Sequence, residues 1–546
     1  MHARLASTAL WATQVLVAGG ALAAGPPAAP APPPWAHVLA LDPPASPRIS
    51  LTLDGRDWRV LPGVVVPLPP VEWPIEDPAV IARLRVTGEI LLMLGLNASL
   101  YWVGKTANSA NWELDGSWES WRKKLITLEG VSFDANVLET NVVFHPFGGA
   151  LYYLIARGND LGMAESLLFS AAASAFWETV PEYREKVSLN DLIFTPVTGI
   201  ALGEPLHALG VLFERGEGTA AHRALAAVFS PFRAIHRWVD GRPATRAPRL
   251  DERGLPFDVR RRLELSAGAG VVARSGGKIA PEERIGAGAE IIQIPEYGRP
   301  GRVARPAPGG SFCEIAVEVA LGEPGAMGID VFSKTTLGGY YWQDIARREG
   351  GGLSGYSLFA GAATAFSYAW RDLSAGYTDK LGAAHLAGPS IDLAVYHRGL
   401  RVRAGLDAYV DFAAVRAAAL DAYVRREAKS GLRSVLADQG YYFALGLTVA
   451  PSISVRYGGV ELAGELRRDV LDSIDGLDRL QQSVTNEVHL QDRRLGYRAR
   501  LAVTPPGGRV EISLLEIEGL ARSGSIGVLR RTYGEIQART RATFLF

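Results

Sequence analysis

Apolar and polar side chains alternate along the end of the chain, from Glu535 to Phe546. Side chains on a β-strand point alternately to its two faces, so the segment predicts a strand with one apolar and one mostly charged face. An apolar face and an aromatic residue at the end are typical of the strand that closes an outer-membrane barrel. The apolar or small face carries Ile536, Ala538, Thr540, Ala542, Phe544 and Phe546, and the other carries Glu535, Gln537, Arg539, Arg541, Thr543 and Leu545.

The same alternation recurs through the second half of the chain. Between Leu400 and Phe412, apolar or small residues at even positions alternate with mostly polar residues such as Arg401. A turn of hairpin length, 397–399, joins this segment to an earlier alternating one, 391–395. Roughly 12 strands of ~10 residues each fit the second half. With an even number of strands, the start of the first strand and the end of the last strand would lie on the same side of the membrane. A soluble β-sandwich, whose charged face would meet water, is the alternative.

The inward residues and the connections between strands predict the interior. Segments 413–439 and 471–491 are long enough to be external loops, and the first, rich in Ala, Arg and Leu, is predicted to carry a helix. Arg and Asp on the inward parity imply a polar lumen, either open or plugged. Cys313, the single cysteine, is predicted to be a small outward-facing strand residue and not a nucleophile.

The beginning of the chain resembles an export signal. A weakly basic start precedes an apolar run, 5–22, and Ala21-Leu22-Ala23 fits the small-x-small rule for cleavage. Residues 1–24 are therefore predicted to be a cleaved signal peptide of a protein exported to the outer membrane. The Pro-rich segment that follows predicts an extended linker at 25–73. An uncleaved inner-membrane anchor is the alternative.

Composition narrows the class of protein. Lys+Arg and Asp+Glu number 57 each, so the formal net charge is zero and nucleic acid is not a predicted partner. Hydrophobic residues make up 48% of the chain, yet no segment after the export signal gives ~20 uninterrupted apolar residues. This combination excludes a bundle of membrane-spanning helices and suits a barrel. Outer-membrane lipid is the predicted partner, with the identity of any small-molecule or lipid ligand left open.

Residues 74–238 predict helices, whereas residues 257–546 predict strands. The fold class is therefore α+β: a helical domain, a linker at 239–256 and an antiparallel transmembrane barrel at 257–546. Within the helical domain, Val80–Val103 predicts a packed helix interrupted by charges. A crowded group of tryptophans predicts either an interfacial anchor or a local core: Trp112, Trp118 and Trp121.

The segment 134–204 concentrates unusual residues. Pro146 suits the first position of a helix, which would place His145 at the helix mouth. The two glycines that follow permit a close approach by another backbone or a ligand. Ser188 and Asp191 have the spacing of a capping box with Asp in place of Glu. Serines four residues apart share one helix face and predict a packing stripe: Ser166, Ser170 and Ser174.

Several motifs run through this segment in order: His145-Pro-Phe-Gly-Gly-Ala-Leu-Tyr-Tyr-Leu-Ile-Ala-Arg157, Glu165-Ser166, Ser174, Trp177-Glu178, Glu182, Ser188-Leu-Asn-Asp-Leu192, Thr195-Pro196, Gly199 and Gly203-Glu204. In this order they resemble the bacterial domain-of-unknown-function family numbered 3943, over residues 134–204. The resemblance implies an envelope protein of the Gram-negative type. It supplies no reaction, substrate or catalytic residue.

Two interpretations of the segment stay open. In the first, its polar side chains hydrogen-bond one another and the helix ends, because buried polar groups need partners. In the second, His145 is a general base oriented by Glu178 or Asp191, and Ser166 or Ser174 is the nucleophile. Carboxylates together with His145 could hold a cation, but without paired histidines or cysteines neither a metal nor a cofactor is predicted. The remaining polar residues of the signature are Asp134, Asn136, Asn141, Arg157, Glu182, Ser188, Asn190 and Glu204.

Three functions follow from these alternatives. The favoured hypothesis is an outer-membrane barrel whose helical domain plugs the lumen or seals its periplasmic face, in a structural, transport or scaffold role. The second is a barrel-anchored envelope hydrolase or transferase that acts on lipid or cell-wall material. The third is a soluble periplasmic binding protein built on a β-sandwich.

Overall fold

The computed structural model describes residues 50–53, 56–61, 64–66, 78–104, 112–277, 279–322, 325–348, 352–374, 377–427, 435–474 and 489–546. The predicted signal peptide lies outside the described residues. Within the predicted linker, β1 (Ser50–Leu53), β2 (Arg56–Leu61) and β3 (Val64–Val66) form a small antiparallel sheet.

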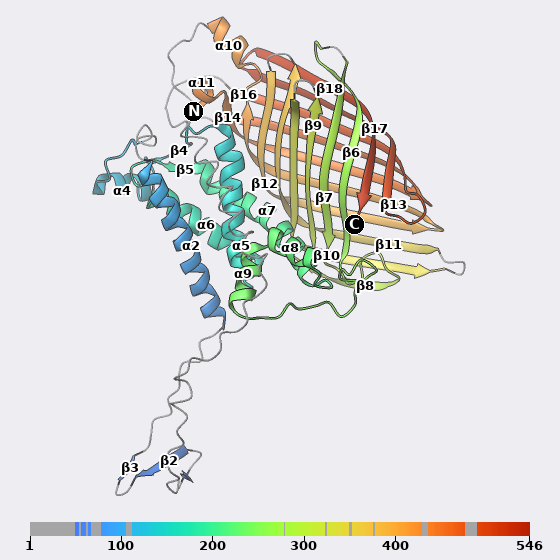
Figure 1. Cartoon of the computed structure of the whole chain (residues 1–546). Helices are drawn as coiled ribbons and strands as arrows, with labels where there is room; N and C mark the ends of the chain where they lie inside the picture. The colour runs from blue at the N-terminus through green and yellow to red at the C-terminus, as the bar shows by residue number, and fades with distance from the viewer. Residues whose placement is uncertain are drawn as a thin grey trace.

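Twelve antiparallel strands form a closed barrel (Figure 1). The last strand, β18, pairs with the first, β6, which closes the cylinder as predicted. A short strand, β8 (Gly301–Pro308), pairs with β10 beyond the end of β9. The barrel strands are β6 (Arg260–Arg274), β7 (Ala280–Ile292), β9 (Phe312–Gly322), β10 (Gly325–Arg347), β11 (Leu353–Ser374), β12 (Tyr377–His397), β13 (Leu400–Arg416), β14 (Tyr441–Tyr457), β15 (Val460–Ser473), β16 (Leu490–Val503), β17 (Val510–Ile526) and β18 (Leu529–Leu545).

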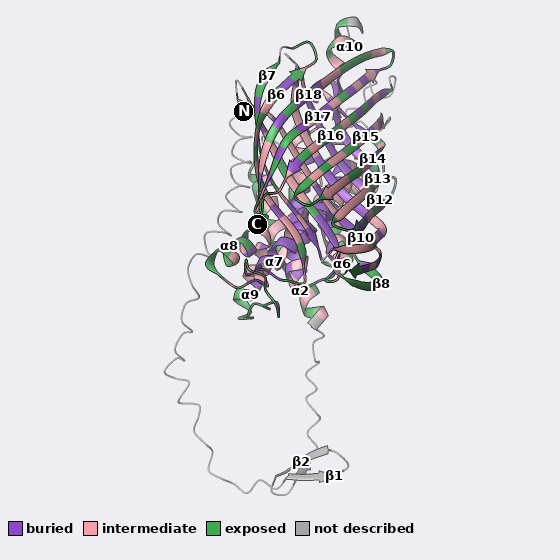
Figure 2. Cartoon of the chain, turned by 90° about the vertical axis from the view of Figure 1, so that its right-hand side faces the viewer, coloured by how far each residue is buried: buried purple, intermediate pink, exposed green. Residues whose placement is uncertain are grey.

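The terminal strand shows how the two faces of the barrel wall differ. Ile536 and Phe544 lie on the outer wall and are 55% and 49% exposed. Arg539 is buried inside, where its guanidinium donates to Glu516 at 2.7 Å and to Glu518 at 3.0 Å on the neighbouring strand. Exposed and buried positions alternate along these strands (Figure 2). An apolar outside and a charged, hydrogen-bonded inside confirm the predicted parity and are the pattern of outer-membrane barrels.

The two ends of the barrel carry different connections. At the end where β6 begins and β18 stops, here called the proximal end, the tight turn Arg398–Gly399 joins β12 to β13. Both turn residues have positive φ, 49° and 86°, as a type I′ hairpin requires. At the opposite, distal end, β13 and β14 are joined by residues that include α10 (Leu420–Glu427) and α11 (Val435–Gln439). The helix predicted in this loop is present, although β13 continues to Arg416.

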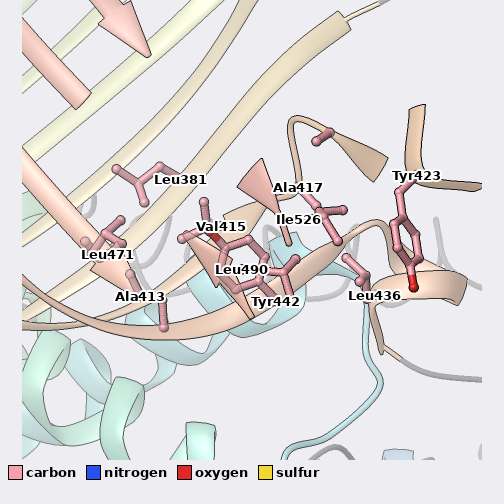
Figure 3. Packing of buried hydrophobic residues seen from close by; sticks show 13 residues of the cluster. Leu381, Ala413, Val415, Ala417, Tyr423, Leu436, Tyr442, Leu471, Leu490 and Ile526 are labelled. Atoms are coloured by element: carbon pink, nitrogen blue, oxygen red, sulfur yellow. The ribbon is translucent and has the colours of Figure 1, made fainter. Parts of the chain in front are cut away.

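An apolar cluster lies at the distal end of the barrel, where residues of the β13–β14 connection meet residues of the strands (Figure 3). Tyr423 and Leu436 come from the β13–β14 connection and are 6% and 0% exposed. They pack against apolar side chains from six strands of the barrel. The lumen is therefore plugged, by a loop of the barrel itself. The strand residues of the cluster are Leu381, Ala383, Ala413, Val415, Tyr442, Ala444, Leu471, Leu490 and Ile526.

Below this cluster the lumen holds a polar cavity of about 870 Å³, here called the chamber. Its lining reaches Gly508 and Phe546, so the chamber extends toward the proximal end. Tyr297, from the connection after β7, reaches partly across and donates to Asp392 at 2.8 Å. Charges of both signs line the chamber, among them Lys334, Arg371, Arg403, Arg498, Glu318 and Glu518.

Helices stand side by side next to the barrel (Figure 1). Four of them form a bundle: α2 (Pro78–Val103), α5 (His145–Gly158), α6 (Met163–Thr179) and α7 (Leu189–Glu214). Among the described helices, α7 is the one long and apolar enough to cross a membrane, and 72% of its most apolar stretch is buried. The shorter elements of this half are α4 (Trp118–Leu125), β4 (Val131–Ser132), the π-helical turn η3 (Thr140–Phe144), β5 (Val187–Ser188), α8 (Ala220–Phe229) and α9 (Pro231–Val239).

Helices α5 and α7 approach each other at two glycines. A Cβ atom at Gly149 would lie 1.8 Å from the carbonyl oxygen of Thr195, and one at Gly199 would lie 2.8 Å from the Gly149 carbonyl carbon. The close approach predicted at Gly149 is therefore made by the backbone of α7. Helix α7 itself continues through Pro196 and Pro205.

The bundle packs on the outer wall of the barrel. On β13, Leu406 and Val410 face outward and are 38% and 49% exposed. Phe412 has the same parity but is 1% exposed, because Phe133 and Phe194 of the helical half cover it. The bundle therefore docks on the outer, apolar face of the barrel wall, the same face that is exposed at Leu406 and Val410.

Contacts along the wall show the same arrangement. A Cβ atom at Gly382 would lie 2.2 Å from Val142, and Ser333 donates to the carbonyl of Ala201 in α7 at 2.7 Å. Cys313 also faces outward, as predicted, and is buried in a cluster with residues of α7. The prediction that the helical domain plugs the lumen is therefore wrong. The apolar wall buries the apolar faces of the helices, which the charged lumen could not do.

Candidate functional site

The polar site of the helical half lies where η3, α5 and α7 meet. His145 is the first residue of α5, directly after the π-helical turn, so Pro146 occupies the second position of the helix and not the predicted first. The Nε2 atom of His145 lies 3.5 Å from Oδ2 of Asp191 in the first turn of α7. Asp134 completes the group, and the ligand atoms of the three residues lie within 4.8 Å of one another. Three separate segments thus bring two carboxylates to one imidazole.

Neighbouring amides hold the Asp134 carboxylate in place. Its Oδ1 atom accepts from the side chain of Asn141 at 2.7 Å, and its Oδ2 atom accepts from the side chain of Asn136 at 2.5 Å. The N–H of Asp134 donates to Oδ1 of Asn190 at 2.9 Å. Asn141 also donates at 2.9 Å to the hydroxyl of Tyr441 on strand β14. The site is therefore tied to the barrel wall.

The start of α7 differs in part from the predicted capping box. The Oγ atom of Ser188 accepts from the N–H of Asp191 at 3.3 Å, as predicted. The N–H of Ser188 donates to the buried carboxyl of Glu178 at 2.7 Å, and not to Asp191. The Asp191 carboxylate instead accepts from Asn190 at 2.8 Å and faces His145. Glu178 thus takes over the capping contact and leaves Asp191 in the polar site.

Burial shifts the ionisation of two groups here, both of which lie outside the barrel strands. It raises the pKa of Glu178 well above its ordinary value, and the charges of Glu182 and Asp191 add to the shift. It lowers the pKa of His145, and the nearby charge of Asp134 opposes this shift. Lowering this pKa favours the neutral imidazole, the form that accepts a proton or binds a metal.

The two candidate nucleophiles direct their hydroxyl groups elsewhere. Ser174 donates to the backbone carbonyl of Asp191 at 3.0 Å, and Ser166 donates to the carbonyl of Gly162 at 2.9 Å. Neither hydroxyl bonds to His145 in the described part of the chain. A general base has to lie within hydrogen-bond reach of the proton it removes. In this conformation, the serines therefore act as packing residues between helices.

The remaining signature residues lie apart from His145. Arg157 donates to Glu204 at 2.8 and 3.0 Å, and the hydroxyl of Tyr153 donates to the same carboxylate at 2.7 Å. This ion pair joins α5 to α7. The backbone carbonyl of Glu182 accepts from Lys124 at 2.9 Å. These contacts hold the bundle together.

The group formed by Asp134, His145 and Asp191 could hold one divalent cation. Two carboxylates and a neutral imidazole are donors that suit zinc or manganese. The amides that fix both carboxylates resemble the outer contacts that orient metal ligands. The sequence predicted no metal because the three donors come from separate elements, without the close spacing of a ligand motif.

A second histidine-centred cluster lies inside the barrel, and sequence reasoning missed it. Ser367, His385 and Asp411 lie on the adjacent strands β11, β12 and β13, and all three are buried. Each strand contributes one residue of the cluster, so no motif links them along the chain. Only the pairing register brings them together.

Residues 130–232 match the family described as a domain of unknown function, DUF3943. The match contains all the signature residues named above and confirms the resemblance. No curated protein matches the chain.

Solved structures similar to the chain include outer-membrane barrels. The translocator domain of autotransporter NalP from Neisseria meningitidis is 14% identical, with 61% of this chain and 99% of that chain covered and a TM-score of 0.20. The KdgM porin is 8% identical, with 52% and 99% covered and a TM-score of 0.19. OpdQ from Pseudomonas aeruginosa is 8% identical, with 53% and 99% covered and a TM-score of 0.17. At these values the likenesses carry no argument about function.

Proposed function

We propose that the chain is a non-conducting outer-membrane scaffold, in which a blind-ended barrel holds a helical bundle against its outer wall. The observation that carries the proposal is the position of the bundle. Helix α7 lies against the outside of the wall, while the β13–β14 connection covers the lumen. A channel would need an open path, which this loop blocks at the distal end.

The joint between bundle and barrel supports a permanent association. Phe412 contacts Phe133 and Phe194 of the helical half at ring-centroid distances of 6.0 and 5.2 Å. Phe443 on the next strand lies 4.6 Å from Phe133. Buried aromatic clusters of this kind contribute large apolar areas and favourable ring contacts. The joint therefore packs apolar rings against one another as the core of a domain does.

The outermost helix supports contact with lipid. Leu84, Leu92 and Val103 of α2 are 68%, 76% and 84% exposed. A helix of 26 residues at ~1.5 Å per residue is longer than the ~30 Å hydrocarbon core of a bilayer. Exposed leucines on such a helix are favourable in hydrocarbon and costly in water. Helix α2 would then face lipid beside the barrel.

The proposal includes the division of the chain. Residues 1–24 are removed on export, and 25–73 link the export signal to the bundle and include the small sheet of β1 to β3. Residues 74–238 form the bundle, 239–256 connect it to the barrel, and 257–546 form the barrel.

Conductance across a planar bilayer tests the proposal. The intact protein is expected to conduct poorly, because Tyr423, Leu436 and their strand partners cover the distal end. Replacing residues 417–440 with a short Gly-Ser turn should open a polar path and give stepwise conductance. Deleting residues 78–238 should leave conductance low, since the bundle lies outside the lumen.

Heat-modifiable mobility on gels confirms that each variant contains a folded barrel. High conductance from the intact protein would contradict a non-conducting scaffold. Conductance that appears on deletion of the bundle, and not on replacement of the loop, would show that the bundle seals the lumen after all.

A further inference from the structure

We propose that the chamber contains a serine hydrolase site, with Ser367 as nucleophile, His385 as general base and Asp411 as the residue that positions the base. This activity goes beyond the scaffold function, because it depends on the lumen and not on the bundle. The site would act on a small polar carboxylic ester.

The distances within the cluster are those that nucleophilic catalysis needs. The Oγ atom of Ser367 lies 2.9 Å from Nε2 of His385. The other ring nitrogen, Nδ1, lies 2.5 Å from Oδ1 of Asp411. A nucleophile bonded to a base, with the base bonded to a carboxylate, is the arrangement that activates a serine hydroxyl.

Neighbouring groups fix the protonation pattern of His385. Arg467 approaches the same Nε2 atom at 3.3 Å and can only donate. The Nε2 atom must therefore be an acceptor, which places the ring proton on Nδ1, where it is donated to Asp411. The second carboxylate oxygen of Asp411 lies 2.5 Å from the hydroxyl of Thr448, which also lies 2.7 Å from Oδ1 of Asp469. This tautomer is the one in which His385 can take the proton of Ser367.

Irregular pairing of the strands places the base. The register between β12 and β13 shifts between His385 and Ala387, and the register between β11 and β12 shifts between Ala363 and Ala365. The hydroxyl of Thr364, inside the second shift, donates to the carbonyl of His385 at 2.7 Å. Bulges are frequent next to active sites, where they redirect a side chain.

Arg467 places a positive charge beside the nucleophile. Its guanidinium donates to Oγ of Ser367 at 2.9 Å and is held by Asp469 at 2.9 Å. A fixed cation beside the nucleophile can stabilise the negative oxygen that develops on an attacked carbonyl. Arg467 is 31% exposed and both it and Ser367 line the chamber, whereas His385 is fully buried behind them. A substrate in the chamber would thus meet the nucleophile first.

The chamber limits the class of substrate. Its volume of about 870 Å³ is within the range of small-molecule sites, ~300–1,000 Å³. Arginine and carboxylate side chains line it, so a long acyl chain would be poorly solvated there. The apolar cluster above Ser367 closes the distal side, and substrate would enter from the proximal end. These features favour a small polar ester.

The reaction needs only the ester and water. Ser367 Oγ attacks the carbonyl carbon, its proton moves to Nε2 of His385, and the carbonyl π pair moves to oxygen beside Arg467. The ester C–O bond then breaks, and the alcohol leaves with the proton from His385. Water attacks the acyl-serine with its proton passing to His385, and collapse releases the carboxylic acid and restores Ser367.

Covalent labelling tests the site. The full-length protein in detergent micelles is treated with diisopropyl fluorophosphate, digested and mapped by mass spectrometry. We expect one phosphoryl adduct, on Ser367, and slow hydrolysis of p-nitrophenyl acetate that the adduct blocks. Asp411→Asn should keep the barrel folded and slow labelling by roughly 100-fold or more, because the base loses its tautomer.

Two serine variants complete the experiment. Ser367→Ala should abolish the adduct, whereas Ser357→Ala, a buried serine earlier on the same strand that does not line the chamber, should not. Heat-modifiable mobility shows whether each barrel is folded. An unlabelled wild-type protein, an adduct on another residue, or labelling of Asp411→Asn at the wild-type rate would overturn the proposal.

Discussion

Two histidine-centred clusters lie on opposite faces of the same barrel wall. Outside, His145 lies 3.5 Å from the Asp191 carboxylate, and both serines considered as its nucleophile donate to backbone carbonyls. Inside, His385 bonds to Ser367 at 2.9 Å and to Asp411 at 2.5 Å. The imidazole is common to both, so its neighbours decide the chemistry. Two carboxylates favour a bound cation, whereas a serine and a carboxylate favour acyl transfer.

The clusters also differ in what assembles them. The inner cluster comes from three adjacent strands, so the register of the barrel is sufficient to form it. The outer cluster comes from three segments of the helical half and is tied to the barrel through Asn141 and Tyr441. The inner site should therefore survive changes in the bundle, while the outer site should depend on docking.

The largest predicted effect separates the two histidines. His385→Gln should slow labelling of Ser367 by roughly 100-fold or more, because it removes the general base. His145→Gln should leave the labelling rate within about twofold, because distant sites without shared partners behave independently. The measurement is the rate of adduct formation by mass spectrometry. Equal losses in both variants would mean that the two clusters are coupled across the wall.

The same two variants should exchange roles when stabilisation of the docked bundle by zinc is measured. Binding of a cation to Asp134, His145 and Asp191 would stabilise the docked bundle by about 2.7 kcal/mol at a free concentration 100 times the Kd. The urea midpoint for exposure of the Cys313 thiol, which is buried in a cluster with α7, reports this stability. His145→Gln should remove the response and His385→Gln should retain it. A response that persists in His145→Gln would place the zinc elsewhere.

The next effect is expected at the joint between bundle and barrel, where a substitution should weaken docking without changing the labelling of Ser367. Phe412→Ala removes a ring that contacts Phe133 and Phe194, and should lower the free energy of docking by roughly 3 kcal/mol. Cys313 should then react with a maleimide at lower urea concentration. The matched control is Leu406→Ala, which changes a residue of the same strand and parity outside the joint.

Comparing Phe412→Ala with Leu406→Ala tests whether the bundle docks at Phe412. If both variants expose Cys313 at the same urea concentration as the wild type, the ring of Phe412 does not support docking. Labelling of Ser367 provides a second readout, which should stay unchanged in Phe412→Ala.

Alternation along single strands was enough to predict the barrel, the inward charges and the hairpin at Arg398–Gly399. It could not predict where the bundle lies. Phe412 and Leu406 are both apolar and share one parity, although a helix covers the first and not the second. Lipid and helix are equally apolar partners for a barrel wall, so composition does not distinguish them.

The sites show a similar limit. His145 and Asp191 could be placed together because both lie in one set of ordered motifs. The group of Ser367, His385 and Asp411 depends on strand register and on two bulges, which periodicity does not reveal. Glu178 could be identified as important, but its role in capping α7 required the structure.

The smallest predicted effect concerns Glu178, whose pKa burial raises in the folded state. The folded bundle then binds more protons than the unfolded chain above the ordinary carboxyl pKa. The stability that Glu178 contributes is fully present at pH values below the ordinary carboxyl pKa. As the pH rises from there to the raised pKa, this stability is lost by up to about 1.4 kcal/mol per pH unit.

Glu178→Gln keeps an acceptor for the N–H of Ser188 without a charge. Its urea midpoint for Cys313 exposure should fall less than the wild type's as the pH rises. Parallel profiles would show that the carboxyl titrates alike in both states. His145, with its lowered pKa, contributes the opposite slope to both proteins, so the difference between the profiles isolates Glu178.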